Sequence, residues 1–116
     1  MMRIDDATYR AIFDTMAEGI VFADNDNRLA YINPAAERIR HIKAERFLGL
    51  DLLSIHSPRL RDSVTELLRA FRTGRQLFHR KKTKIRGELF ENSYHAVRDK
   101  KGNYLGALMV SRAVAG

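Results

Sequence analysis

The side chains of this sequence that could ligate a haem iron are its four histidines, His41, His56, His79 and His95. A thiolate ligand is excluded because the 116 residues include no cysteine. The same absence excludes disulfides, cysteine zinc sites and thiol nucleophiles, and it is compatible with a reducing compartment. We expect His56 to have an ordinary hydrogen-bonding or capping role, and the other three histidines to lie at the surface.

A second group that could do chemistry is the polar pair Asn92 and Tyr94 in the segment 89-LFENSYHAV-97. Alternation along a strand places Phe90, Asn92 and Tyr94 on one face and the intervening residues on the other. A buried side-chain amide left without partners costs roughly 1–3 kcal/mol. Asn92 and Tyr94 could therefore orient a small polar or aromatic ligand, or they could simply bond to backbone or water.

The third group is the basic run 79-HRKKTKIR-86 in a chain of net charge +7. A clustered basic face attracts phosphate backbones, so this run raises the hypothesis of a nucleic-acid or anion-binding module. It lacks the interleaved aromatic residues that stack bases, and it belongs to no recognition helix. Alternation also spreads its charges over both strand faces, with Arg80, Lys82, Lys84 and Arg86 on one. We favour a solvated strand edge that discourages aggregation, with no nucleic-acid partner, and keep the binding module as the alternative.

Catalytic motifs are absent from the sequence. It contains no glycine-rich phosphate loop, no nucleophile elbow and no pair of carboxylates at metal-ligand spacing. Asp24, Asp26 and Glu37 lie near one another, but turn and helix-start roles explain them. We therefore expect no enzyme, no catalytic residue and no metal site.

The length of the chain fits a single domain that buries one hydrophobic core without needing disulfides or a structural metal. No stretch approaches the roughly 18 apolar residues of a membrane span. Met1-Met2-Arg3 is not followed by the apolar run of a signal peptide. The sequence therefore predicts a cytoplasmic protein.

The first half of the sequence predicts a helix followed by a hairpin. Apolar residues recur at spacings near three and four after Asp5 and Asp6, either of which could cap a helix; they are Ile4, Tyr9, Ile12, Phe13 and Met16. Gly19 ends this pattern, and 20-IVFA-23 is an apolar run of strand length. The turn 24-DNDN-27 then connects it to a second strand, 28-RLAYIN-33.

Two helix starts follow, each with a capping residue before a proline. At Asn33-Pro34 the pattern takes helical spacing, with Asn33 as the cap and Pro34 at the first helical position. At Ser57-Pro58 a longer helix opens and runs to about Gly74, a good terminator. Its apolar residues form one stripe: Leu60, Val64, Leu67, Leu68 and Phe71.

The rest of the sequence predicts strands over about 76–86, 88–98 and 103–114, with a glycine turn at 99-DKKG-102. The order is therefore one helix, two strands, short helices, one long helix and three strands. Helices inserted between strands that end in a three-strand meander indicate an α+β domain with an antiparallel sheet.

These elements resemble a PAS domain, a sensory module of bacterial kinases, transcription regulators and cyclic-nucleotide enzymes. The resemblance covers about residues 10 to 114. It rests on 18-EGIVFADNDNRLAYINPAAERI-39, Gly49 and 94-YHAVRDKKGNYLGALMVSR-112. The first segment looks like the opening hairpin and Asn-Pro helix start of the family. The last looks like its final hairpin, with a second glycine at Gly106.

The resemblance implies a five-stranded antiparallel sheet with short helices and one long helix packed on one face. Residues 18–114 would form the core domain, and residues 1–17 an amphipathic helix that crosses the sheet or pairs with its copy in a dimer. A pocket between sheet and helices would accept a ligand or be filled by side chains. Its expected lining is Phe22, Tyr31, Ile39, His56, Leu60, Val64, Phe90, Asn92, Tyr94 and Met109, although plain core packing is the alternative role of the apolar members.

The resemblance also limits which cofactors the chain could bind. Light-sensing flavin members use a cysteine adduct, and the coumarate-type photoreceptor attaches its pigment through cysteine, so the absence of cysteine rules out both photocycles. The chain also has no tryptophan, a common stacking partner of a noncovalent flavin. Haem-binding members often place the axial histidine in the long helix, and residues 58–73 contain none. Haem is therefore not expected, and the cofactor is left open.

By this resemblance the chain is a signal-input domain that binds a small ligand or a partner. It would form a homodimer and regulate an output domain of the full-length protein, such as a histidine kinase of a two-component system, a transcription regulator or a cyclic-nucleotide enzyme. One feature departs from the family, which often closes with Asp-Ile-Thr after an arginine. Here Arg112-Ala113-Val114 lacks the carboxylate of that hydrogen-bonded exit.

Overall fold

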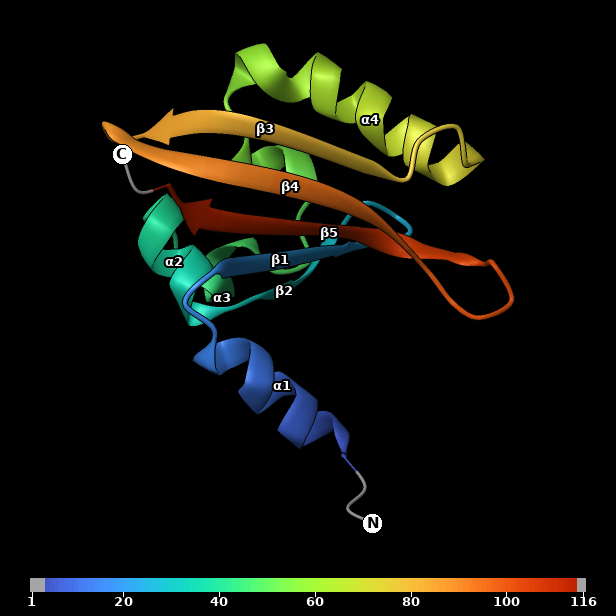
Figure 1. Ribbon diagram of the computed structural model, residues 1–116, viewed down its shortest axis with the longest axis horizontal. Helices are drawn as coiled ribbons and strands as arrows, with labels where there is room; N and C mark the ends of the chain where they lie inside the picture. The colour runs from blue at the N-terminus through green and yellow to red at the C-terminus, as the bar shows by residue number, and fades with distance from the viewer. Residues whose placement is uncertain (1–3, 115–116) are drawn as a thin grey trace.

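The computed structural model describes residues 4–114, so the first three residues of the expected N-terminal segment lie outside the described residues (Figure 1). The elements follow in this order: α1 (Asp6–Thr15), β1 (Gly19–Asp24), β2 (Leu29–Ile32), α2 (Pro34–Arg40), α3 (Ala44–Phe47), the 3₁₀ turns η1 (Leu52–Ile55) and η2 (Pro58–Leu60), α4 (Arg61–Thr73), β3 (Phe78–Ile85), β4 (Glu88–Arg98) and β5 (Tyr104–Ala113).

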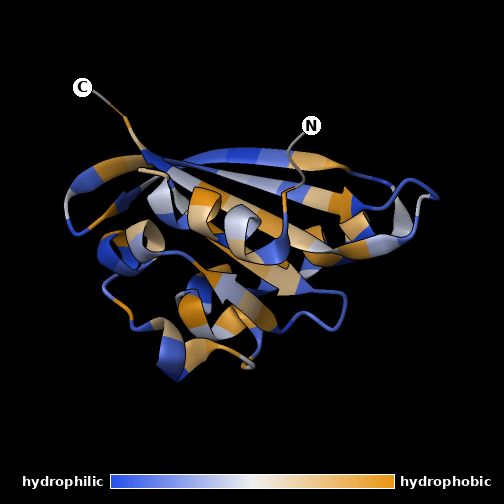
Figure 2. Cartoon of the chain, turned by 90° about the horizontal axis from the view of Figure 1, so that it is seen from below, coloured by the Kyte–Doolittle hydropathy of each residue, from blue (hydrophilic) through white to orange (hydrophobic). Residues whose placement is uncertain are grey.

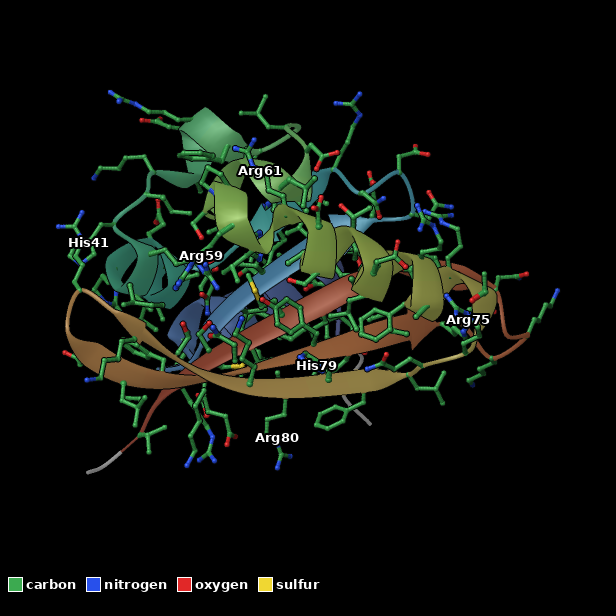
Figure 3. All side chains as sticks on the ribbon, turned by 90° about the horizontal axis from the view of Figure 1, so that it is seen from above. His41, Arg59, Arg61, Arg75, His79 and Arg80 are labelled. Atoms are coloured by element: carbon green, nitrogen blue, oxygen red, sulfur yellow. The ribbon has the colours of Figure 1, made fainter. Side chains whose placement is uncertain are left out.

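The five strands form one antiparallel sheet in the order β2-β1-β5-β4-β3. The helices α2, α3 and α4 lie on one face of this sheet, called the inner face here (Figures 1 and 3). This arrangement confirms the predicted fold class, an antiparallel sheet with short helices and one long helix on one face. The strand β3 is an edge strand, as its basic sequence suggested.

The core lies between the inner face and the helices. The apolar stripe of α4 supplies Val64, Leu67, Leu68 and Phe71, and Phe71 is fully buried. Facing them are Val21 and Ala23 of β1 and Ala107 and Met109 of β5. Gly74 ends α4 in a left-handed conformation, which glycine adopts without the cost of a Cβ.

The start of the long helix differs from the prediction. Ser57 makes no side-chain capping bond, and Pro58–Leu60 form the tighter 3₁₀ turn η2 before α4 begins at Arg61. Such turns are common at the amino ends of helices, and proline fits one as well as it fits the first turn of an α-helix.

The helix α1 is capped by Asp5, whose carboxylate accepts the amide of Thr8 at 2.8 Å. It extends away from the sheet below β1 and β2 (Figure 1), and none of its residues is buried. Figure 2 views the molecule from this side and shows hydrophobic residues on α1 and on the strands behind it. Tyr9 and Phe13 keep 51% and 40% of their surface exposed. Among the described residues no helix is long and apolar enough to cross a membrane.

Candidate ligand-binding site

A cavity of about 400 Å³ lies between α4 and the strands β3 and β4, and it is called the α4–β3 cavity below. This volume falls within the range of pockets that hold small molecules. Its lining is Leu60, Ser63, Val64, Glu66, Leu67, Ala70, Arg75, Gln76, His79, Lys81 and Tyr94. Three residues of the predicted lining, Leu60, Val64 and Tyr94, therefore meet in one cavity.

The register of β3 on β4 decides which basic side chains face this cavity. His79 pairs with Tyr94 and Lys81 with Asn92, so these residues share the inner face. Arg80 and Lys82 pair with Ser93 and Glu91 and face the other way. Figure 3 shows His79 between β3 and α4, whereas Arg80 lies on the opposite side of β3.

Two sequence expectations on histidines change with this register. His79 is half-buried and lines the α4–β3 cavity, so the expectation of a surface position was wrong for it. His95 is half-buried on the outer face, with its Nε2 3.0 Å from Ser93 Oγ, whereas His41 is exposed as expected. Pairing partners come from the sheet rather than from local sequence, which is why alternation alone could not assign the faces of β3.

His56 was expected in the lining, but it does not line the α4–β3 cavity and lies behind Tyr94, which does. His56 is buried, with Nδ1 3.0 Å from the carbonyl of Leu52 and Nε2 3.3 Å from the hydroxyl of Tyr94. A carbonyl only accepts, so Nδ1 carries the proton and Tyr94 donates its hydroxyl hydrogen to Nε2. Both ring nitrogens therefore have partners, which agrees with the hydrogen-bonding role favoured for His56.

The environment keeps this histidine uncharged. Burial lowers the pKa of His56 to about 4 against the opposing effect of the hydrogen bond to Leu52, and the positive charges of Arg40 and Lys81 lower it further. Burial also raises the pKa of Tyr94, while the charge of Arg40 acts in the opposite direction. At neutral pH the pair is thus a neutral imidazole and a neutral phenol, which orient hydrogen bonds without adding charge.

Arg40 ends α2 and reaches into the core, which the sequence analysis did not foresee. Its Nη2 lies 3.1 Å from the sulfur of Met109, and its buried Nε has no hydrogen-bond partner among the described residues. Burial lowers the pKa of its guanidinium. A signal was present in the sequence, because Arg40 stands four residues after the buried Ala36 and therefore on the same side of the helix.

Asn92 is buried on the inner face as expected, but its carbonyl oxygen is already satisfied. Ser111 on the neighbouring β5 donates its hydroxyl to Asn92 Oδ1 at 2.6 Å. Both residues are buried and pair directly across the two strands. Asn92 does not line the α4–β3 cavity.

The other predicted lining residues lie elsewhere. Met109 is core, directly across from Tyr94. Ile39 and Phe90 line a separate hollow of about 520 Å³ with Ile85 and Ala113. Phe22 and Tyr31 were expected in the same space as Tyr94, but they lie on the outer face of the sheet. The reason is the register of β1, which turns Val21 and Ala23 inward.

Phe22 and Tyr31 instead line an apolar groove of about 540 Å³ beneath α1, called the outer groove below. Its other apolar residues are Tyr9, Phe13, Met16, Ile20, Val97, Leu108 and Val110. The rings of Phe13 and Tyr31 are 6.0 Å apart, and the Tyr31 hydroxyl donates to the carboxylate of Asp14. Burial and this hydrogen bond raise the pKa of Tyr31.

The C-terminal segment Arg112-Ala113-Val114, which departs from the family pattern, is hydrogen-bonded to the sheet. Arg112 donates from Nη2 to the carboxylate of Glu91 at 2.9 Å, and the amide of Val114 donates to Leu89 at 3.0 Å. Within residues 4–114, no group of three or more histidine, aspartate or glutamate side chains is arranged to hold a metal ion.

An antiparallel five-stranded sheet with helices over one face and a cavity between them defines a small α+β domain. The chain belongs to the PAS domain family, whose model matches residues 10–114. None of the curated proteins compared with the chain matches it.

Solved structures show the same fold at low sequence identity. The PAS domain of BvgS from Bordetella pertussis is 17% identical, with a TM-score of 0.75 over 95% of this chain and 86% of that one. A PAS domain from Colwellia psychrerythraea is 18% identical, with a TM-score of 0.72 over 95% and 98%. A sensory box sensor histidine kinase from Vibrio cholerae is 10% identical, with a TM-score of 0.69 over 95% and 91%.

Proposed function

We propose that this PAS domain is the signal-input module of a larger signalling protein, binds a small molecule in the α4–β3 cavity and regulates an output domain as a homodimer. The observation that carries the proposal is the cavity itself, because its volume of about 400 Å³ suits a small ligand and Tyr94, which His56 holds by a hydrogen bond, lies at its wall. The similarity to a sensory box sensor histidine kinase supports an output domain of that class.

The mechanism is a shift between two populated states. A ligand moves such an equilibrium only by the difference in its affinity for the two states. The cavity is bounded by α4 on one side and by the edge strand β3 on the other, so occupancy biases the distance between them. PAS domains are generally not enzymes, and this mechanism requires no catalysis by the domain.

The dimer is supported by the unburied apolar side chains of α1. An isolated helix of ten residues is marginal in water, and a helix with an apolar face gains stability by covering it. A second copy of α1 and of the outer groove offers a self-complementary apolar surface. This arrangement places the dimer contact on the face opposite the α4–β3 cavity.

The nucleic-acid alternative has less support. Arg80 and Arg112 share the carboxylate of Glu91, which reduces the charge that the outer face presents. Lys81 faces the α4–β3 cavity rather than the outer face of the sheet. Duplex DNA at low and high salt tests the alternative: tight, steeply salt-dependent binding that is lost when Lys81, Lys82 and Lys84 are neutralised would favour it.

Ligand binding is tested by thermal-shift screening of the purified protein against a library of small metabolites, followed by mass spectrometry of whatever denaturation releases from it. Ser63→Trp places a large ring at the cavity and should abolish the shift. Ser57→Trp is the matched control, since Ser57 is exposed, makes no capping bond and does not line the cavity. If no compound gives a shift that Ser63→Trp abolishes, the ligand-binding proposal is wrong.

A further inference from the structure

Arg40 is an uncompensated positive charge beside the candidate site. Its Nε is buried without a hydrogen-bond partner, and its Nη2 meets only the sulfur of Met109, a weak acceptor. None of the ion pairs of the described residues includes it. Arg40 is half-buried as a residue, and its buried Nε is a polar atom left without a partner, which is unfavourable.

The charge of Arg40 reaches the wall of the α4–β3 cavity. Met109, which Arg40 contacts, pairs directly with Tyr94 across β5 and β4, and Tyr94 lines the cavity. Arg40 acts electrostatically on both Tyr94 and His56. In a low-dielectric interior such an interaction is much stronger than in water.

The cavity itself is also positive. Two basic residues, Lys81 and Arg75, line it together with His79. The single carboxylate of its lining belongs to Glu66, which pairs with Arg69 on the exposed side of α4. Figure 3 shows Arg59 and Arg61 at the start of α4, so further positive charge lies at that end of the helix.

We propose that the ligand of the α4–β3 cavity is a small anion with a carboxylate or phosphate group, bound by Lys81 next to Tyr94, with Arg40 supplying countercharge from behind Tyr94. This inference rests on the proposed function of the cavity. Lys81 is the direct contact, because it lines the cavity and an ammonium group can donate up to three hydrogen bonds. Arg40 is a positioning residue, which acts through its charge and through Tyr94.

The test is an NMR titration of the ¹⁵N-labelled protein with three probes: succinate, inorganic phosphate and the uncharged analogue succinamide. Succinate or phosphate should shift the amide signals around Lys81, Tyr94 and His56, and succinamide should not. Whichever of succinate and phosphate binds with the higher affinity shows whether the site prefers a carboxylate or a phosphate group. Binding of succinamide with the affinity of succinate would overturn the inference, as would the absence of binding by both anions.

Two pairs of variants sharpen the test. Lys81→Met should lower the affinity for the anion about tenfold or more. Lys82→Met changes the neighbouring residue, which lies on the opposite face, and should change the affinity less than about twofold. Arg40→Met should also weaken anion binding yet leave the melting temperature of the empty protein equal or higher, since it replaces a half-buried charge that has no ion-pair partner among the described residues. Equal losses in Lys81→Met and Lys82→Met, or a lower melting temperature with unchanged affinity in Arg40→Met, would contradict the proposal.

The outcomes separate this inference from the proposed function. If uncharged compounds of the library bind in a way that Ser63→Trp abolishes while both anions fail, the cavity is a ligand site but the anion inference is wrong. If neither anions nor library compounds bind, both proposals fail together.

Discussion

The side-chain oxygen of Asn33 accepts a hydrogen bond from the backbone amide of Ile20, thirteen residues earlier in the chain, at 2.8 Å. The same oxygen accepts the amide of Ala36 at 2.9 Å, which caps α2. The side-chain amide of Asn33 donates to the carbonyls of Phe13 and Glu18. One fully buried side chain thus joins the end of α1, the start of β1 and the start of α2.

Replacing Asn33 with alanine should therefore cost more than a helix cap, which is worth about 0.5–2 kcal/mol. The substitution leaves several buried backbone groups unpaired, at about 1–3 kcal/mol each when water cannot reach them. We expect the free energy of unfolding to fall by about 3 kcal/mol, as measured by urea denaturation. Asp5→Ala is the control, because Asp5 only caps the exposed α1. A loss in Asn33→Ala no larger than in Asp5→Ala would contradict this structural role.

Asn33 shows how much of the fold the sequence could predict. The residue types Asn33-Pro34 correctly predicted the turn from strand to helix, because capping depends on neighbours in the chain. The bonds of Asn33 to Ile20 and Phe13 join residues far apart in the sequence, and no local pattern encodes them. The sequence therefore underestimated what Asn33 does.

The residues of the candidate site likewise include some that the sequence placed correctly and some that it could not place. On β4, strand alternation grouped Asn92 and Tyr94 on one face, and the resemblance to the PAS family correctly placed that face inward. On β1 the run 20-IVFA-23 is apolar at every position, so alternation gave no sign that Phe22 faces outward. The inward direction of Lys81 depends on its pairing with Asn92, which only the sheet determines.

The buried neutral state of His56 predicts a dependence of stability on pH. Its pKa is about 4 in the folded protein and near the ordinary 6.5 when unfolded, so the unfolded chain binds more protons between these values. The contribution is fully present above about pH 6.5 and is lost as the pH falls toward 4. A shift of this size corresponds to about 3 kcal/mol.

Urea denaturation at several pH values between about 4.5 and 6.5 measures this slope. Three carboxylates have a lowered pKa in the folded protein, Asp5, Glu91 and Asp99, and their contribution is lost mainly below their ordinary values of 3.8 to 4.5, at or under the lower edge of that window. The variant His56→Gln should therefore flatten the slope, whereas His41→Gln, at an exposed position, should leave it unchanged. An equal slope in His56→Gln and the wild-type protein would show that His56 is not the titrating group.

Gly106 allows two strands to approach closely. A Cβ at this position would lie 2.0 Å from the backbone oxygen of Ala23 on β1, and the φ of Gly106 is +152°. Relief of that contact requires β1 and β5 to separate in the middle of the sheet. We expect Gly106→Ala to lower the free energy of unfolding by about 3 kcal/mol or more, or to prevent soluble expression.

Gly49 provides the matched control, since its φ is +88° but nothing lies within 4 Å of a Cβ built there. Gly49→Ala should cost only the left-handed backbone strain, about 1–2 kcal/mol. Denaturation of both variants separates backbone strain from the clash with Ala23. Similar losses in the two variants would mean that the close approach of β1 and β5 is not what requires Gly106.

The proposed dimer predicts that charge on α1 separates the subunits without unfolding them. Tyr9→Glu places a carboxylate among exposed apolar side chains at the outer groove, and a buried unpaired charge at an interface is strongly unfavourable. Sedimentation velocity should show a dimer for the wild-type protein and a monomer for Tyr9→Glu. The melting temperature of dilute monomer should change little, because no residue of α1 is buried within one chain.

Leu105→Glu is the control for this experiment, because Leu105 is exposed at the start of β5 and does not line the outer groove. It introduces the same charge outside the expected contact and should leave the dimer intact. Should Leu105→Glu dissociate the dimer while Tyr9→Glu does not, the subunits associate through another face. In that case the apolar side chains of α1 would be covered by the output domain or by a partner rather than by a second copy.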